Sequence, residues 1–164
     1  MKTFRKGGIH PHENKLTANN PILELPVPEE LVIPTSQNIG ATSKPCVKAG
    51  DWVGRGEMIA EAGGFVGAPI HSPVNGIIKK IEKVRNPQGF WQEAIILTPD
   101  PQDPLKHNFP NRSQEDIDKL SSVEIIDLVG KAGIVGLGGA AFPTRVKLSV
   151  PSGKKIDTVL INGA

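Results

Sequence analysis

Glycine recurs at short intervals between residues 36 and 98, and this pattern constrains the fold more than any other feature of the chain. Turns that contain glycine lie at Gly50-Asp51, 54–56, Gly63-Gly64 and Asn75-Gly76, the last predicted to be a tight primed turn. Apolar stretches between the turns favour strands at 57–60, 65–70 and 76–84, and one more in GFWQEAIILTP. The sequence therefore predicts a small all-β module over residues 36–98.

Proline-rich segments flank this module on both sides. Residues 1–35 contain prolines at positions 11, 21, 26, 28 and 34, which exclude long helices and favour an extended arm. The apolar pieces PILELP and ELVIP suit edge strands or an arm that lies across a domain. Residues 99–112 hold four prolines and almost no hydrophobic periodicity, so they are predicted to be a linker.

A helical pattern begins after the linker. Residues 113–120 and 121–132 are predicted helices, the second with a capping box from Ser121 to Glu124 and with Gly133 just beyond its end. Pro143 suits the first turn of another helix, and KIDTVLING is typical of a buried strand. Residues 113–164 are therefore interpreted as the beginning of an α/β domain. Because a domain that stops at its first strand has no complete core, we expect the chain to be a fragment of a longer protein.

Composition excludes several classes of function. The 19 basic residues are mixed with 17 acidic ones, and they form no basic stripe of the kind that binds nucleic acid. No window of about 18 uncharged apolar residues is present, so no transmembrane segment is expected. The single cysteine, Cys46, can form no internal disulfide and suits a reducing compartment; alone, it cannot hold an iron–sulfur cluster.

A second concentration of glycine lies in GIVGLGGAAFPTRVKL, residues 133–148. Glycines let backbone N–H groups approach a ligand closely, and a glycine-rich turn that runs into a helix suits a phosphate group. Lys147 lies four residues after Pro143, so on a helix its ammonium group would reach back toward the loop. We interpret the segment as a phosphate cradle. The alternative, that the glycines only allow two helices to pack closely, stays open.

Two general nucleotide motifs do not account for this loop. A Walker loop requires a lysine where Gly139 stands. Gly136, Gly138 and Ala141 match the dinucleotide fingerprint literally, but they follow a helix rather than a strand. A common Rossmann site is therefore not expected.

The segment GLGGAAFPTRVKL resembles the flavin loop in the FMN-carrying, NADH-oxidising subunit of respiratory complex I, and it resembles the RnfC family more closely. Members of that family are subunits of the Rnf complex, an ion-translocating ferredoxin–NAD oxidoreductase of bacterial membranes. FRKGGIHPHENK, GDWVGRGEMIAEAGGFVGAPIHSPVNGII and INGA are similar to RnfC proteins in the same order. The resemblance covers essentially the whole chain.

The resemblance implies a set of cofactor contacts. Five residues would bind FMN, and a sixth, an aromatic residue, would stack on NADH: Gly136, Leu137, Gly138, Lys147 and Asn162 for FMN, and Phe142 for NADH. It implies no catalytic side chain and no metal ligand in this chain. Leu137 stands where the complex I protein has arginine, which removes a side-chain contact. Ala141 replaces the last glycine of the cluster, which puts in doubt any backbone conformation with positive φ.

The resemblance also implies an α+β fold. An all-β barrel-sandwich hybrid module, like biotinyl and lipoyl domains, would precede the start of an α/β flavin-binding domain at residues 113–164. The missing C-terminal part would carry two 4Fe-4S clusters. The partners would be the other Rnf subunits at the membrane and ferredoxin-linked electron transfer, and the location the cytoplasmic face of the inner membrane. Residues 1–164 alone are expected to bind FMN weakly or not at all and to be inactive.

Three alternatives bear on this interpretation. Carrier domains present a lysine at the tip of a hairpin, but EAGGFVGAP has none, so covalent carriage is not expected. The β module could instead be a non-catalytic docking module of a membrane redox complex. The related flavin-dependent cobalamin reductase of microcompartments shares the flavin loop, but its barrel-like segment follows the flavin domain rather than preceding it.

A few other residues suggest weaker sites. His10 and His12 would share a face of a strand, but a metal would need two more ligands from elsewhere. Lys44 and Lys48 could depress the pKa of Cys46, although a buried, unreactive thiol is the favoured interpretation. The two tryptophans, Trp52 and Trp91, are candidates for interface anchors or for caps over a small barrel.

Overall fold

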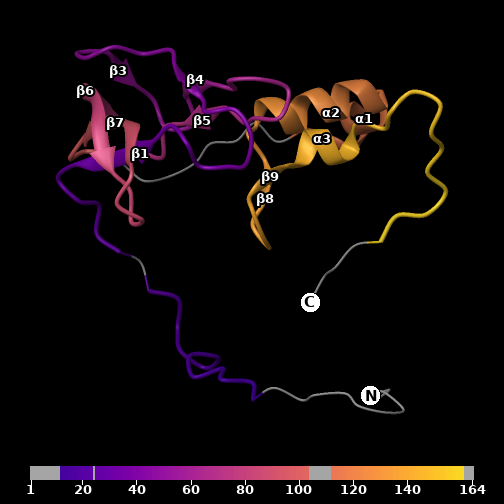
Figure 1. Cartoon of the computed structure of the whole chain (residues 1–164), viewed down its shortest axis with the longest axis horizontal. Coiled ribbons are helices and arrows are strands. Elements are labelled where there is room, and N and C mark those ends of the chain that lie inside the picture. Colours follow the sequence, from indigo (N-terminus) through magenta and orange to yellow (C-terminus); the bar gives the residue numbers. More distant parts are fainter. Residues whose placement is uncertain (1–11, 24, 104–111, 161–164) are drawn as a thin grey trace.

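The computed structural model describes residues 12–23, 25–103 and 112–160. The strands that precede the helices in the chain lie on one side of the molecule and the helices on the other, and the N-terminal segment runs away from both (Figure 1). The strands that precede the helices are β1 (Leu31–Pro34), β2 (Lys44–Pro45), β3 (Trp52–Val53), β4 (Met58–Glu61), β5 (Ile70–His71), β6 (Gly76–Arg85) and β7 (Trp91–Pro99). They are followed by α1 (Gln114–Asp118), α2 (Ser122–Lys131), β8 (Val135–Gly136), β9 (Phe142–Pro143) and α3 (Thr144–Leu148).

Strands β1 to β7, called here the β module, form two antiparallel sheets. One sheet has the order β1-β7-β6-β3, and the other has the order β2-β4-β5. Each sheet places apolar side chains against the other, because alternate residues of a strand point to one face. The buried residues between the sheets are Ile33, Val53, Ile59, Ala60, Ile70, Val74, Ile78, Ile95 and Leu97. This arrangement confirms the expected β fold, and the structure as a whole agrees with the α+β class.

The predicted strand at 65–70 is wrong except at its end, since only Ile70 pairs in β5. The preceding residues fold back on the loop that leads into β2, where the backbone N–H of Ala41 donates to the carbonyl of Val66 (2.8 Å). Gly63 allows this approach because a Cβ there would collide with the carbonyl of Thr42. A close contact between two loops has thus replaced strand pairing.

The primed turn predicted at Asn75-Gly76 is also wrong. Neither residue has a positive φ, which a type I′ turn requires at both central positions. Gly76 instead begins β6 at a point where a Cβ would collide with the carbonyl oxygen of Thr98. The glycine therefore serves close strand approach rather than turn geometry.

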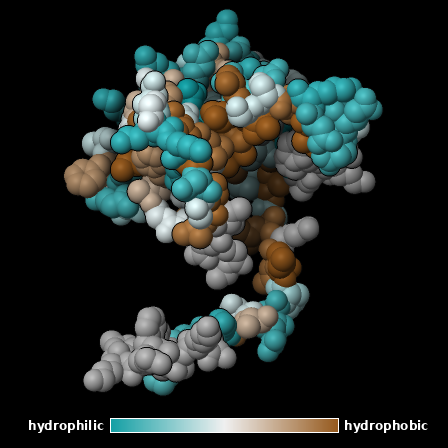
Figure 2. Space-filling view, turned by 90° about the vertical axis from the view of Figure 1, so that its right-hand side faces the viewer, coloured by the Kyte–Doolittle hydropathy of each residue, from teal (hydrophilic) through white to brown (hydrophobic). Residues whose placement is uncertain are grey.

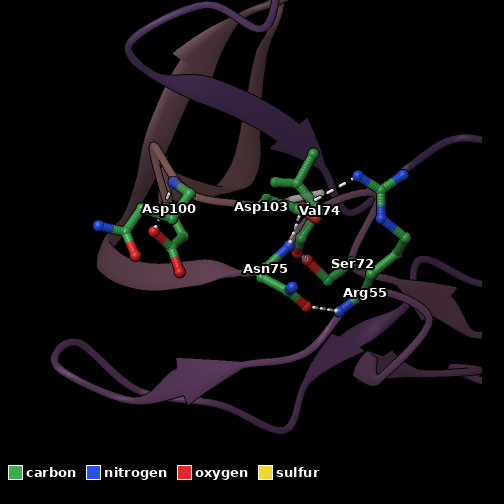
Figure 3. Close-up of polar contacts among 7 residues, drawn as sticks. Arg55, Ser72, Val74, Asn75, Asp100 and Asp103 are labelled. Atoms are coloured by element: carbon green, nitrogen blue, oxygen red, sulfur yellow. Dashed lines mark hydrogen bonds and ion pairs between the residues drawn. The ribbon is translucent and has the colours of Figure 1, made fainter. Parts of the chain in front are cut away.

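Two segments outside residues 36–98, the range predicted for the β module, also belong to it or contact it. β1 lies in the predicted arm and pairs with β7, with Ile33 opposite Ile95, so ELVIP is an edge strand. Asp103, in the predicted linker, accepts hydrogen bonds from Arg55 (2.9 Å) and from the backbone N–H of Asn75 (2.7 Å) (Figure 3). The Arg55 and Asp103 side chains are only 12% and 3% exposed. This cluster holds the chain against the β module as it leaves β7.

Residues 112–160, called here the helical unit, are organised by local interactions. Ser121 and Glu124 form the predicted capping box at the start of α2, with the Glu124 carboxylate accepting from the Ser121 backbone N–H at 2.8 Å. Gly133 follows the C-cap of α2 with φ +68°, as expected for a residue just beyond a helix end. Pro143 is the N-cap of α3, one position before the predicted place.

The buried strand predicted in KIDTVLING is not found in its described part, residues 155–160. These residues are exposed, Leu160 by 93%, and form no strand. A strand needs a neighbour to take up its backbone hydrogen bonds, and none lies beside this segment among the described residues. Figure 2, which faces the side where the helices lie, shows hydrophobic side chains exposed over the middle of the surface.

Candidate flavin-binding site

The glycine-rich segment folds as a short hairpin. β8 and β9 pair antiparallel, with Val135 opposite Pro143 and Gly136 opposite Phe142, and we call residues 134–143 the glycine hairpin. The backbone N–H of Thr144 donates to the carbonyl of Ile134 (2.9 Å), which closes the base of the hairpin where α3 begins. The segment predicted to be a loop between two helices is therefore a β-hairpin. Its tip consists of residues 137–141.

Ala141 adopts φ +50°, and it is the only described residue other than glycine in the left-handed region. An alanine there costs about 1 to 2 kcal/mol relative to ordinary backbone. The sequence analysis questioned whether alanine, in place of the last glycine of the cluster, allows a positive φ at this position. The backbone of Ala141 does have a positive φ despite its methyl group. The hairpin contacts that surround Ala141 must offset this cost.

Lys147 reaches back from α3 over β8. A Cβ built on Gly136 would collide with Lys147 Nζ, so the ammonium group occupies the space that a side chain at position 136 would take. This placement agrees with the direction in which helical side chains lean. α3 is a single turn of five residues, so few peptide dipoles align there. Positive charge at this site therefore comes mainly from the Lys147 ammonium.

The tip of the hairpin begins at the residue after Gly136, and its glycines are exposed. A Cβ on Gly138 or Gly139 would meet nothing within 4 Å, and the Leu137 side chain is 86% exposed. Phe142 is half-buried in β9. The structure thus brings Gly136 and Lys147 into contact, with Leu137, Gly138 and Phe142 on the same hairpin. Asn162 lies outside the described residues.

The hairpin is attached to the β module by residues that the sequence analysis did not single out. The guanidinium of Arg145, on α3, lies 5.3 Å from the ring centroid of Phe65 in the loop between β4 and β5. The backbone N–H of Ile39 donates to the carbonyl of Ala140 at the hairpin tip (3.1 Å). The available signals were an aromatic residue beside two glycines and an arginine inside the flavin-loop motif.

The weaker candidate sites fare differently. His10 lies outside the described residues, and among those described no three His, Cys, Asp or Glu side chains cluster in a way that could hold a metal. Cys46 is exposed rather than buried, and its thiol contacts the Met58 carbonyl at 3.4 Å. Partial burial of the thiol and the nearby Glu61 raise the pKa of Cys46, contrary to the suggested depression by lysines. An ordinary, weakly nucleophilic thiol follows.

The tryptophans do not cap the core. Trp52 and Trp91 are both more than half exposed, on opposite ends of the large sheet, and Trp91 carries Arg85 over its ring at 5.2 Å.

Within the part of the chain that the structure describes, no helix has the length and apolar character needed to cross a bilayer.

Two family models match successive parts of the chain. Residues 2–102 match the RnfC barrel sandwich hybrid domain, which agrees with the two packed sheets of the β module. Residues 129–164 match the Nuo51 FMN-binding domain, and this match includes the whole glycine hairpin and Lys147. The expected barrel-sandwich hybrid is confirmed.

Curated relatives align with nearly the whole chain, and each is a subunit of a named oxidoreductase complex. The relative from the proton-translocating ferredoxin:NAD(+) oxidoreductase complex of Clostridium ljungdahlii is 40% identical over 166 residues, which cover 100% of this chain and 35% of the relative. Its counterpart from the Na(+)-translocating complex of Acetobacterium woodii is 40% identical, with 97% and 36% covered. The relative from the ion-translocating oxidoreductase complex of Vibrio cholerae is also 40% identical, with 96% and 20% covered. The chain thus spans about a third or less of the length of these relatives, and the match over residues 2–102 shows that it belongs to the RnfC family.

Proposed function

We propose that this chain forms the N-terminal part of the flavin- and NADH-binding subunit of an ion-translocating ferredoxin:NAD(+) oxidoreductase. The names of the relatives support this reaction class, and the match of residues 129–164 to an FMN-binding domain supports the cofactor. The observation that carries the proposal is the position of the Lys147 ammonium over Gly136, beside a hairpin tip with open space at Gly138 and Gly139.

The phosphate of FMN is the group that this arrangement fits best. A phosphate needs positive charge and backbone N–H donors without side chains in the way. Lys147 would supply the charge, and Gly136 and Gly138 would allow close approach of the backbone. Leu137 would contribute its backbone, since its side chain carries no charge. Asn162 would complete the FMN contacts.

Phe142 is proposed as the residue that stacks on the nicotinamide nucleotide. It lies opposite Gly136 in the hairpin, so a nucleotide held there would be next to the flavin cradle. The Ala141 methyl group would narrow the part of the pocket that holds the nicotinamide nucleotide, and it would leave the contact between Gly136 and Lys147 unchanged. When bound, FMN would supply the chemistry, exchanging a hydride with NADH and passing single electrons onward.

The remainder of the protein would carry two 4Fe-4S clusters that pass electrons to other Rnf subunits and to ferredoxin. This chain would lie on the cytoplasmic face of the inner membrane and contact its partners there. Residues 1–35 as an arm, 36–98 as the barrel-sandwich module, 99–112 as a linker and 113–164 as the start of the flavin domain remain our proposed division. Residues 1–164 alone are proposed to be inactive.

An anaerobic FMN titration of the full-length protein tests the proposal. The wild-type protein should bind FMN, and NADH should then bleach the flavin absorbance. Lys147→Ala should weaken FMN binding by roughly 10- to 100-fold, the effect of losing a hydrogen bond to a charged group. Gly136→Ala should act in the same direction because its methyl group displaces the ammonium. Lys83→Ala, which removes an exposed lysine of β6, is the matched control and should bind as wild type does.

A docking role for the β module is the second candidate, because Trp52 and Trp91 are exposed on it. Exposed aromatic residues are enriched at protein interfaces. If Lys147→Ala left NADH oxidation unchanged while Trp91→Ala prevented assembly of the complex, the chain would be a docking module. Absence of FMN binding by the wild-type protein would refute the flavin proposal directly.

A further inference from the structure

We propose that the contact between Phe65 and Arg145 positions the flavin cradle, so that the β module acts as a rigid support for the glycine hairpin. This inference rests on the proposed function, since it concerns the same hairpin. It assigns positioning roles to two residues outside the FMN and NADH contacts. Phe65 belongs to the loop between β4 and β5, and Arg145 lies two residues before Lys147 on α3.

The geometry of the contact is that of a cation stacked on an aromatic face. The Arg145 guanidinium carbon lies 5.3 Å from the Phe65 ring centroid, within the range of about 6 Å at which such pairs attract. Phe65 is otherwise 58% exposed, so it buries little of its ring in the core of the β module. The contact of its ring with Arg145 therefore joins Phe65 to the helical unit rather than to the core of its own module.

Gly130 holds Arg145 in place from the other side. It is the one buried residue of α2, and a methyl group there would lie 2.9 Å from Arg145 Cδ. The aliphatic part of Arg145 thus passes directly over the helix backbone at Gly130 before its guanidinium reaches Phe65. This path links α2, α3 and the β module through one side chain.

Two further contacts join the same parts. Ile39 donates its backbone N–H to Ala140 at the hairpin tip (3.1 Å), and a Cβ on Gly133 would lie 2.6 Å from the Pro69 carbonyl oxygen. The hairpin is therefore held at its base near Gly133, at its tip near Ala140 and through α3 at Arg145. Because α3 has only five residues, a shift of Arg145 would move Lys147 with it.

The experiment compares variants of the full-length protein by FMN fluorescence titration and by hydrogen–deuterium exchange of peptides that cover residues 134–143. Phe65→Leu and Arg145→Gln should each weaken FMN binding about two- to fivefold, as expected for loss of a cation–aromatic pair at a partly exposed site. Both should speed exchange in the hairpin. The double variant should be no weaker than either single one, because the two changes remove the same contact.

Two controls separate positioning from general packing. Phe65→Tyr keeps the ring and should restore wild-type affinity and exchange. Phe90→Leu changes an aromatic residue of similar exposure (71%) that lies beside β7, away from the hairpin, and should alter neither readout. If Phe65→Leu unfolds the β module, Arg145→Gln tests the same contact from the other side.

The inference is overturned if Phe65→Leu and Arg145→Gln bind FMN as wild type does, or if Phe65→Tyr is as weak as Phe65→Leu. Equal weakening by Phe90→Leu would overturn it as well. If the wild-type protein binds no flavin, the proposed function fails and the exchange data decide alone. Faster hairpin exchange in Phe65→Leu, restored in Phe65→Tyr, would then support positioning, and unchanged exchange would refute it.

Discussion

The β module and the helical unit are stabilised in different ways. The β module buries a cluster of nine hydrophobic residues between its two sheets. The ion pair of Arg55 and Asp103 also holds the chain against the module after β7 ends. In the described part of the helical unit only Gly130 and Pro143 are buried, and Val123 and Leu160 are largely exposed. The helical unit depends on caps, a short hairpin and contacts with the β module. The candidate binding site is thus supported by a neighbouring core rather than by one of its own.

The largest expected effect is on the core of the β module. Ile95→Ala removes a fully buried side chain between the sheets and should lower the free energy of unfolding by about 2 to 5 kcal/mol. The matched change in the helical unit, Val123→Ala, removes a side chain that is 67% exposed and should have an effect within about 0.5 kcal/mol. Chemical denaturation measures both, and equal losses would contradict the comparison.

The buried ion pair offers a second contrast. Asp103→Ala leaves Arg55 without this carboxylate partner in a nearly buried position and removes the acceptor for Asn75, so a loss of about 3 kcal/mol is expected. Glu115→Ala breaks the exposed pair with Lys119 on α1 and should cost less than about 0.5 kcal/mol. Thermal unfolding distinguishes the two. A small effect of Asp103→Ala would show that the linker does not help to hold the β module.

A smaller effect is expected at the hairpin tip. The β module has glycine at its positions of positive φ, such as Gly50 and Gly56, whereas the glycine hairpin has Ala141. Ala141→Gly should relieve backbone strain at the expense of a more flexible unfolded chain, for a net gain of about 0.5 to 1 kcal/mol. The midpoint of thermal unfolding of the helical unit should rise. Gly138→Ala is the reverse comparison, since its Cβ meets open space and its φ is not positive, and it should raise stability by about 0.4 to 1 kcal/mol through a less flexible unfolded chain alone.

The smallest effect concerns pH and the capping box. Hydrogen bonds from the Ser121 hydroxyl and backbone lower the pKa of Glu124 below its ordinary value of 4.5. A lowered pKa in the folded state means that the stabilisation is present above the pKa of the unfolded chain and is lost as pH falls through the folded value. Circular dichroism should therefore show α2 losing helicity as pH falls below about 4, given ordinary carboxyl pKa values. Glu124→Gln should remove this pH dependence, and an unchanged acid profile in that variant would exclude the cap as its cause.

Local patterns in the sequence predicted much of the architecture. Glycine turns and alternating apolar residues indicated β4, β6 and β7, and the Ser121 and Glu124 pair indicated the start of α2, because these signals act over a few neighbouring residues. The motif around Lys147 likewise indicated the position of the candidate site, since the spacing of Pro143 and Lys147 on one turn sets their relative direction.

Other features were decided only by contacts between distant segments. The loop at 65–69 did not become a strand because it packs on residues 40–43, and Gly76 serves a close approach to Thr98 rather than a turn. Ala141 has a positive φ despite its methyl group within a hairpin closed at its base and tip, which local propensity could not indicate. The support of the hairpin by Phe65 and Arg145, 80 residues apart in sequence, exists only in the tertiary structure. Sequence patterns thus indicated most of the elements and the residues of the candidate cradle. Long-range packing determined how the glycine hairpin is held, because such packing depends on residues that no local pattern connects.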